Sequence, residues 1–281
     1  MPTPSSLSNA ALLESVHRHL DELLMMVDDA GRLIMDVYRR AEPVAVSLKS
    51  DDSPVTEADI LANTLLVERL RQCFPDLPIV TEEASESFAH RHPEKPFWLL
   101  DPLDGTREFI NRTDQFTVNV ALVVGGLPVV GVVAAPALNQ LYWAIESVGS
   151  FARSSGTMVA LQAASFPERL PAGGFATPVR LLASQNHLSE ETRRFIEAIQ
   201  PHQLHQAGSS LKFCRLAEGA ADCYPRHSPT CEWDTAAGQA VLEIAGGSVR
   251  RLDGSRLTYG AGGELNPSFI ATGTGGAWPL D

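Results

Sequence analysis

The chain has 281 residues, of which 44% are hydrophobic and 20% charged, a composition that supports a folded core and excludes a disordered protein. Its 22 basic and 34 acidic residues give a net charge of −12, which disfavours binding a nucleic acid polymer through a basic surface. A small anionic substrate is still possible, because a bound cation can reverse the charge inside one cleft. No segment approaches the roughly 20 apolar residues of a membrane span, and the N-terminus lacks the pattern of a signal peptide. The 4 cysteines form no CxxC pair, so we expect reduced thiols in a cytoplasmic protein.

Hydrophobic periodicity and turn residues predict a mixed α+β layout. Apolar residues at three- and four-residue steps predict a first helix that begins at Ser8 or Asn9. Thr56 and Asp59 have the spacing of a capping box and begin a second helix. The predicted helices span residues 8–40, 56–74, 189–199, the first part of 209–225, and 232–245. The predicted strands are 44–49, 77–83, 97–101, a meander over 116–145, 179–184, and the last part of 209–225.

A polar, Gly- and Ser-containing region near residues 146–178 is the best candidate for a boundary. We therefore expect two parts, an N-terminal α+β half over residues 1–155 and a C-terminal α/β half over residues 156–281.

Two apolar strands end in acidic residues. Glu82 and Glu83 follow one strand, and Asp101 and Asp104 follow the other. If both strands lie in one sheet, these carboxylates converge, and their repulsion requires either a proton or a cation between them. Ligands that are all oxygen select a hard ion such as Mg²⁺.

The residues around Asp101 and Asp104 also favour an anion. Pro102 fixes the backbone, and Gly105 permits an unusual turn. Gly105 and Thr106 then open a short helix, whose amides can bind phosphate. Metal ligands beside anion donors are typical of metal-assisted phosphoryl transfer. The alternative is a surface turn, since Asp, Pro and Gly all form turns.

Two other acids have two interpretations each. Asp234 stands at a predicted helix start, where it is either a helix cap or a metal ligand. Asp59 is either the acid of the capping box or the partner of a catalytic hydroxyl.

Taken together, these segments resemble the inositol monophosphatase superfamily of metal-dependent, lithium-sensitive phosphatases. The resemblance rests on WLLDPLDGTREF (98–109) and WDTAAGQAVLEIAGG (233–247), with DDSPVTEADILAN (51–63) and TEE (81–83) in the family's order. It runs from about residue 44 to 270. Within the superfamily, the chain most resembles the bacterial CysQ-type 3′(2′),5′-bisphosphate nucleotidases, which are enzymes of sulfur metabolism. The segments that carry this resemblance are DPLDGTREF, GSSLKFC, ADCYPR and EWDTAAG.

The resemblance implies a layered α/β/α/β/α sugar-phosphatase fold and two or three Mg²⁺ per active site. By the same resemblance, Glu82, Asp101 and the carbonyl of Leu103 bind the first Mg²⁺. Asp101, Asp104 and Asp234 bind the second, so the N-terminal half carries most of the ligands and the C-terminal half completes the site. Thr106, oriented by Asp59, is the implied catalytic pair.

The implied reaction removes the 3′-phosphate of 3′-phosphoadenosine 5′-phosphate and leaves AMP. Ser209, Lys212 and Arg226 match positions that hold the nucleotide and its 5′-phosphate. The residues implied in substrate binding are Glu82, Asp101, Gly105, Thr106, Ser209, Lys212, Arg226 and Asp234.

Two departures from the family pattern concern the substrate. Gln185 and Asn186 stand where the branch has Arg and Ser, which removes one cation, whereas Arg107 replaces a lysine and keeps the charge. Lys49 is expected near the cleft entrance.

Two rival functions are an inositol monophosphatase or other sugar-phosphate phosphatase, and a non-catalytic nucleotide-binding sensor. The sequence leaves open whether the protein is a monomer or a homodimer, and whether it associates peripherally with the cytoplasmic face of the inner membrane.

Overall fold

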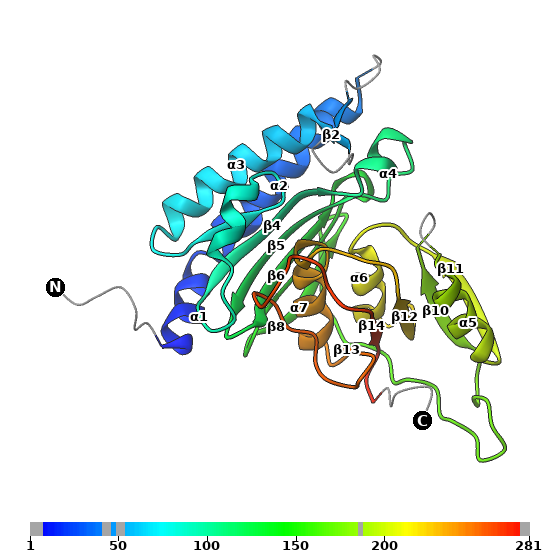
Figure 1. Cartoon of the computed structure of the whole chain (residues 1–281). Coiled ribbons are helices and arrows are strands. Elements are labelled where there is room, and N and C mark those ends of the chain that lie inside the picture. The colour runs from blue at the N-terminus through cyan, green and yellow to red at the C-terminus, as the bar shows by residue number, and fades with distance from the viewer. Residues whose placement is uncertain (1–7, 41–45, 49–53, 185–187, 276–281) are drawn as a thin grey trace.

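The computed structural model describes residues 8–40, 46–48, 54–184 and 188–275, whose helices and strands stack in five alternating layers (Figure 1). This arrangement confirms the predicted α+β, layered α/β/α/β/α fold. Lys49, Gln185 and Asn186, and part of the predicted strand 44–49, lie outside the described residues.

The first layer consists of α1 (Asn9–Arg18), α2 (Leu20–Tyr38) and α3 (Glu57–Cys73), which share a hydrophobic core with one face of the larger sheet. The single helix predicted over residues 8–40 is wrong in one respect, because it breaks at His19, where φ is −104° and ψ is 20°. There the ring Nδ1 of His19 lies 2.8 Å from the carbonyl of Ser15. The start of α3 was predicted correctly, with Thr56 and Asp59 as its capping box.

The second layer is a seven-stranded sheet in which the strands follow chain order. Only the first pair is parallel, and the others are antiparallel. The predicted meander is confirmed and extends by two further strands. The strands are β3 (Ile79–Thr81), β4 (Phe97–Asp104), β5 (Thr117–Val124), β6 (Leu127–Ala135), β7 (Gln140–Ile145), β8 (Gly149–Ser154) and β9 (Thr157–Ala160).

Both faces of this sheet are buried, which explains why its strands are almost continuously apolar. In β5, Val120 and Leu122 face the N-terminal helices, whereas Ala121 and Val123 face the opposite core.

The third layer consists of α6 (Leu211–Ala217) and α7 (Ala236–Ile244), which lie between the two sheets (Figure 1). The smaller, five-stranded sheet follows, and α5 (Glu190–Ala198) covers its far face. In spatial order its strands are β11 (His202–Gln206), β10 (Val179–Ala183), β12 (Cys223–Arg226), β14 (Phe269–Thr272) and β13 (Ser248–Arg251).

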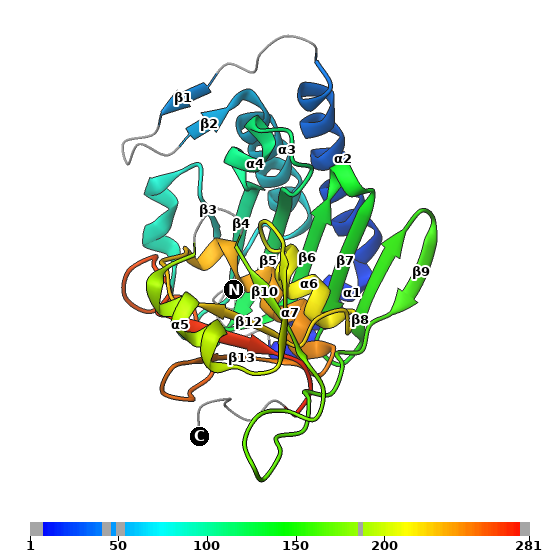
Figure 2. The ribbon, with the colours of Figure 1, turned by 90° about the vertical axis from the view of Figure 1, so that its right-hand side faces the viewer.

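Short elements complete the fold around the open end of the larger sheet. Figure 2 shows the hairpin of β1 (Val46–Leu48) and β2 (Pro54–Thr56) close to α4 (Thr106–Ile110). The remaining elements are 3-10 helices: η1 (Ser85–His90), η2 (Pro136–Leu138) and η3 (Glu232–Asp234).

The larger sheet ends at Ala160 and the smaller one begins at Val179, so the predicted boundary after residue 155 lies in the turn between β8 and β9. No helix in the described part of the chain is long and apolar enough to cross a membrane. All 4 cysteines lie in the described part of the chain and are free thiols there.

Candidate active site

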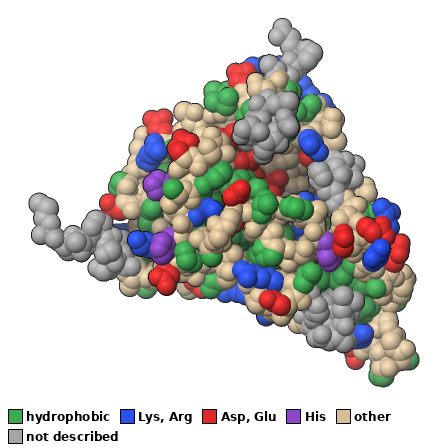
Figure 3. All heavy atoms as spheres, in the orientation of Figure 1, with side chains coloured by type: hydrophobic (Ala, Val, Ile, Leu, Met, Phe, Trp, Pro, Cys, Tyr) green, Lys and Arg blue, Asp and Glu red, His purple; other side chains and the backbone are tan. Residues whose placement is uncertain are grey.

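A cavity of about 330 Å³ opens where the ends of β3 and β4 meet α4, α6 and η3. Acidic side chains lie in a hollow on this face of the molecule (Figure 3). The predicted site residues that line the cavity are Glu82, Asp101, Leu103, Asp104, Gly105, Thr106, Ser209, Lys212, Arg226 and Asp234. Asp59 is buried behind Thr106.

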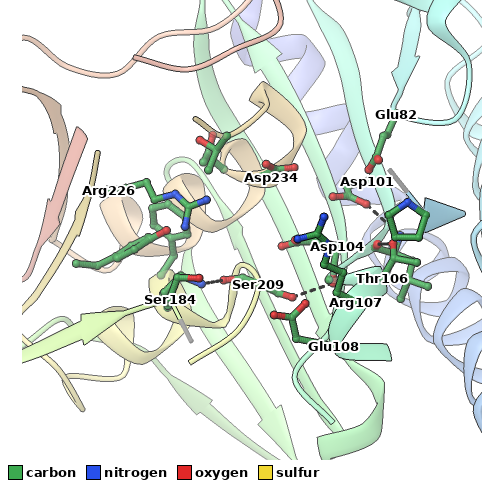
Figure 4. A pocket seen from close by; sticks show the side chains of 18 residues that line it. Glu82, Asp101, Asp104, Thr106, Arg107, Glu108, Ser184, Ser209, Arg226 and Asp234 are labelled. Carbon is green, nitrogen blue, oxygen red and sulfur yellow. Dashed lines mark hydrogen bonds between the residues drawn. The ribbon is translucent and has the colours of Figure 1, made fainter. Parts of the chain in front are cut away.

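The carboxylates reach this cavity from separate segments of the chain (Figure 4). Asp101 and Asp104 come from β4, and Asp234 comes from η3, about half the chain away. One oxygen from each of these three lies within 4.8 Å of the others. Glu82, which follows β3, is within hydrogen-bonding reach of Asp101. Glu82, Asp101 and Asp104 therefore converge as predicted, together with Asp234, whereas Glu83 is not among the residues that line the cavity.

The strand prediction near Asp101 needs a correction, because β4 continues beyond Asp101 to Asp104. Its pairing with β5 is interrupted between these two residues by a register shift. Asp101 Oδ1 accepts a hydrogen bond from the amide of Leu103 at 3.0 Å. This bulge turns both aspartates toward the cavity, as bulges often do beside active sites.

Gly105 closes the turn after β4. Its φ of +91° is in the left-handed region, and a Cβ at this position would lie 2.5 Å from Ser209 Oγ. The hydroxyl of Ser209 lies 2.8 Å from the carbonyl of Asp104 and 2.9 Å from that of Gln115, and it donates to both. Glycine is therefore required for the loop before α6 to approach the turn.

Ser210 links two of the acids. Its amide donates to Asp104 Oδ2 at 2.8 Å, and its hydroxyl donates to the carbonyl of Asp234 at 2.6 Å. The carboxylate of Asp234 is held in a similar way, since its Oδ2 accepts from the amide of Cys231 at 2.8 Å. Backbone donors thus fix the orientation of both acids.

Burial and mutual repulsion raise the proton affinity of the cluster. Burial, followed by the charges of Glu82 and Asp104, raises the pKa of Asp101 well above its usual value. Burial and the charge of Asp104 do the same to the pKa of Asp234. Burial raises the pKa of Asp104 from 3.8 to about 6, although Lys212 opposes the rise.

These features fit a hard divalent cation. The donors are oxygen atoms only, they are close together, and they carry more negative charge than the buried site tolerates without a proton or a cation. A cation would remove the repulsion that raises these pKa values.

Thr106 and Asp59 form the predicted pair. Thr106 Oγ1 lies 3.3 Å from Asp59 Oδ1 and 3.3 Å from the carbonyl of Leu103. The other oxygen of Asp59 accepts from the amide and the hydroxyl of Thr56, at 2.8 and 2.6 Å. Asp59 therefore serves as capping-box acid and as hydrogen-bond partner of Thr106 at once, and the catalytic role of this pair stays a prediction.

Two basic side chains that line the cavity, Lys212 and Arg226, form a cationic wall beside the acids. Lys212 is only 4% exposed, so it is a buried cation and not a solvated surface lysine. Its Nζ donates to the carbonyls of Ala207 and Ser209, at 3.1 and 2.8 Å, and burial lowers its pKa to about 8. The guanidinium of Arg226 donates to the carbonyls of Ser228 and Pro229, each at 3.2 Å.

Sequence reasoning missed several residues of the candidate site. Glu108 and Tyr224 line the cavity, and Ser210 orients two acids without lining it. Thr117 and Asn119 donate to Asp104 from the neighbouring strand, each at 3.3 Å. The sequence indicated only the last two, because polar side chains in an otherwise apolar, buried strand need a buried hydrogen-bond partner.

The fold and this site define the class of the protein, and comparison with known proteins agrees: the chain belongs to the inositol monophosphatase family, whose model matches residues 18–275. The 3′(2′),5′-bisphosphate nucleotidase CysQ of Salmonella typhimurium is 41% identical over 254 residues, 90% of this chain and 99% of the relative. The CysQ of Escherichia coli K12 is 40% identical over 251 residues, 89% of this chain and 98% of the relative. The crystal structure of CysQ from Bacteroides thetaiotaomicron superposes with a TM-score of 0.74 at 35% identity, covering 90% of this chain and 96% of that one.

Proposed function

We propose that the chain is a Mg²⁺-dependent phosphoric monoester hydrolase that converts 3′-phosphoadenosine 5′-phosphate, and related bisphosphate nucleotides, to AMP and phosphate. The observation that carries this proposal is one cavity lined both by an acidic cluster and by the cations Lys212 and Arg226, whose charges act on Asp104 and Asp234. The nucleotidases that are about 40% identical over nearly their whole length support the choice of substrate.

The acidic residues have two proposed sets of ligands. Glu82, Asp101 and the Leu103 carbonyl would hold one Mg²⁺, and Asp101, Asp104 and Asp234 would hold a second. When bound, such ions polarise the phosphate and neutralise charge on the attacking and leaving oxygens. The backbone amides of Gly105 and Thr106 would bind phosphate oxygens at the start of α4.

The Thr106–Asp59 pair would handle the proton. The Thr106 hydroxyl faces the cavity and donates to Asp59, so it can accept a hydrogen bond from the attacking water. As the water attacks phosphorus, its proton would pass through the hydroxyl to the Asp59 carboxylate, while the bond from phosphorus to the 3′-oxygen breaks and that oxygen takes a proton from solvent to leave as the 3′-hydroxyl of AMP. Thr56, which donates twice to Asp59, keeps that carboxylate oriented.

The cationic wall would select a second phosphate. Arg226 presents a planar fork that suits phosphate oxygens, and Lys212 supplies a fixed positive charge. The Ser209 hydroxyl hydrogen-bonds to two carbonyls, so we assign it to holding the Gly105 turn rather than to donating to the substrate.

The cytoplasmic location, the two-part division of the chain and the oligomeric state stay predictions.

Parallel assays of phosphate release test the proposal. Purified protein with Mg²⁺ is given 3′-phosphoadenosine 5′-phosphate or inositol 1-phosphate, with Asp101→Asn as the inactive control. We expect the nucleotide to have the higher kcat/KM and millimolar Li⁺ to inhibit. Faster turnover of the inositol phosphate would favour a polyol phosphatase. Tight nucleotide binding without any phosphate release would favour a sensor.

A further inference from the structure

A nearly buried ion pair lies outside the residues that line the cavity and joins two of the segments that supply it. Arg91 follows η1, the segment after Glu82, and Glu232 stands two residues before Asp234. Arg91 Nη1 lies 3.3 Å from Glu232 Oε2, and the two side chains are 9% and 4% exposed.

The pair also gathers a third segment. Arg91 donates from Nη1 to the carbonyl of Gly263 at 2.8 Å and from Nη2 to that of Gly262 at 3.1 Å. Glu232 Oε1 accepts from the amide of Gly260 at 2.8 Å. Both partners are thus hydrogen-bonded to the same segment, residues 260–263, which makes the link between them rigid.

Neighbouring contacts carry this link to the acids. The rings of Phe88 and Trp233 pack with their centres 4.8 Å apart, so the same two segments meet again beside Asp234. Ser87 Oγ accepts from the amide of Thr81 at 3.0 Å, which ties η1 back to the end of β3, next to Glu82. A shift of Arg91 relative to Glu232 would therefore change the separation of Glu82 and Asp234.

Stability alone does not explain this pair. A buried ion pair is often no more stabilising than apolar residues of the same volume, because both charges lose water. Here Arg91 Nε has no hydrogen-bond partner in the described part of the chain, and Glu232 Oε2 has only the 3.3 Å ion pair to Arg91, so desolvation is incompletely offset. Glu82 and Asp234 carry like charges that repel, and a fixed link between their segments opposes that repulsion.

We propose that Arg91 and Glu232 are positioning residues that set the separation of Glu82 and Asp234 and thereby the cation affinity of the acidic cluster. The proposal rests on the proposed function, since it assumes that the cluster binds divalent cations. Residues that orient metal ligands commonly change metal affinity by about 10- to 100-fold when they are replaced.

Mn²⁺ binding by isothermal titration calorimetry, alongside steady-state kinetics, tests the proposal on the full chain. The variants are Glu232→Gln and Arg91→Lys, and the matched control is Asp222→Asn. Asp222 is the buried partner of Arg180 in an ion pair of 2.6 Å outside the cavity. We expect Glu232→Gln to weaken Mn²⁺ binding about tenfold or more and to raise the Mg²⁺ concentration for half-maximal rate equally, with kcat at saturating Mg²⁺ changed much less. Arg91→Lys, which keeps the charge but loses the fork, should weaken binding less, and Asp222→Asn should leave it unchanged while lowering stability.

Wild-type Mn²⁺ affinity in a folded Glu232→Gln variant would overturn the proposal, as would an equal loss of affinity in the Asp222→Asn control. If Glu232→Gln does not fold, the Mn²⁺ affinity of Arg91→Lys is the test, and a wild-type affinity in that variant overturns the proposal. A wild-type protein that binds no Mn²⁺ would overturn the proposed function itself, which separates the two failures.

Discussion

Replacing Asp104 by asparagine is expected to stabilise the cation-free protein while abolishing its activity. The folded environment raises the pKa of this carboxyl from 3.8 to about 6, chiefly through burial. A tenfold change in proton affinity is worth about 1.4 kcal/mol, so the ionised carboxylate costs the folded state about 3 kcal/mol above pH 6. Because the folded pKa is raised, this cost to the free energy of unfolding is absent below about pH 4, grows as the pH rises, and is complete once the pH is above about 6. The asparagine amide carries no charge at any of these pH values, so the variant lacks this dependence.

Urea unfolding in EDTA, followed by tryptophan fluorescence at pH 4 and pH 7, measures the effect. We expect Asp104→Asn to match the wild type within about 1 kcal/mol at pH 4 and to exceed it by about 3 kcal/mol at pH 7. Adding Mg²⁺ should close most of this gap, because a cation at about 100 times its Kd stabilises the wild type by about 2.7 kcal/mol. The exposed Asp76→Asn serves as control and should change neither value. A variant no more stable than the wild type at pH 7 in EDTA would refute the electrostatic reasoning.

Three further substitutions test other parts of the site. Thr106→Ala should lower kcat about 100-fold, whereas Thr106→Ser keeps the hydroxyl and most of the rate, and equal losses in phosphate-release assays would contradict the proton path. Gly105→Ala should destabilise the protein by more than about 2 kcal/mol in urea, because its Cβ would meet Ser209 Oγ at 2.5 Å. Gly125 also has a positive φ, +58°, but a Cβ there would have no atom within 4 Å. Gly125→Ala should therefore lose only the stability that backbone strain costs, and an equal loss of stability in both variants would argue against the clash. Arg226→Gln should raise KM for the bisphosphate nucleotide about tenfold and leave that for inositol 1-phosphate unchanged, and an equal effect on both would remove Arg226 from phosphate selection.

Features set by neighbouring residues were predictable from the sequence. The capping box of α3 needs only Thr56 and Asp59, which are three positions apart, and both hydrogen bonds are present. The apolar strands of the larger sheet and the acids at their ends were visible for the same reason. The convergence of Asp101, Asp104 and Asp234 needed more, namely the assumption that their segments meet in space, and the motif resemblance supplied it.

Features set by distant contacts were not predictable. β11 has the sequence HQLHQ, whose polar residues give no strand pattern, and it forms because its backbone pairs with β10. The burial of Lys212 depends on carbonyls in the loop before α6 and on the ring of Tyr224, 5.2 Å away. Arg91 and Gly263 are 172 positions apart, and no local pattern marks either as a partner.

A crystal grown or soaked with Mn²⁺ and AMP, measured at the manganese absorption edge, tests most directly whether Glu82, Asp101, Asp104 and Asp234 form one cation site. We expect anomalous peaks in contact with the carboxylates of Asp101, Asp104 and Asp234, with Glu82 contacting a peak that Asp101 shares. Peaks confined to other parts of the surface, with these carboxylates in contact only with protein and water, would contradict a shared cation site.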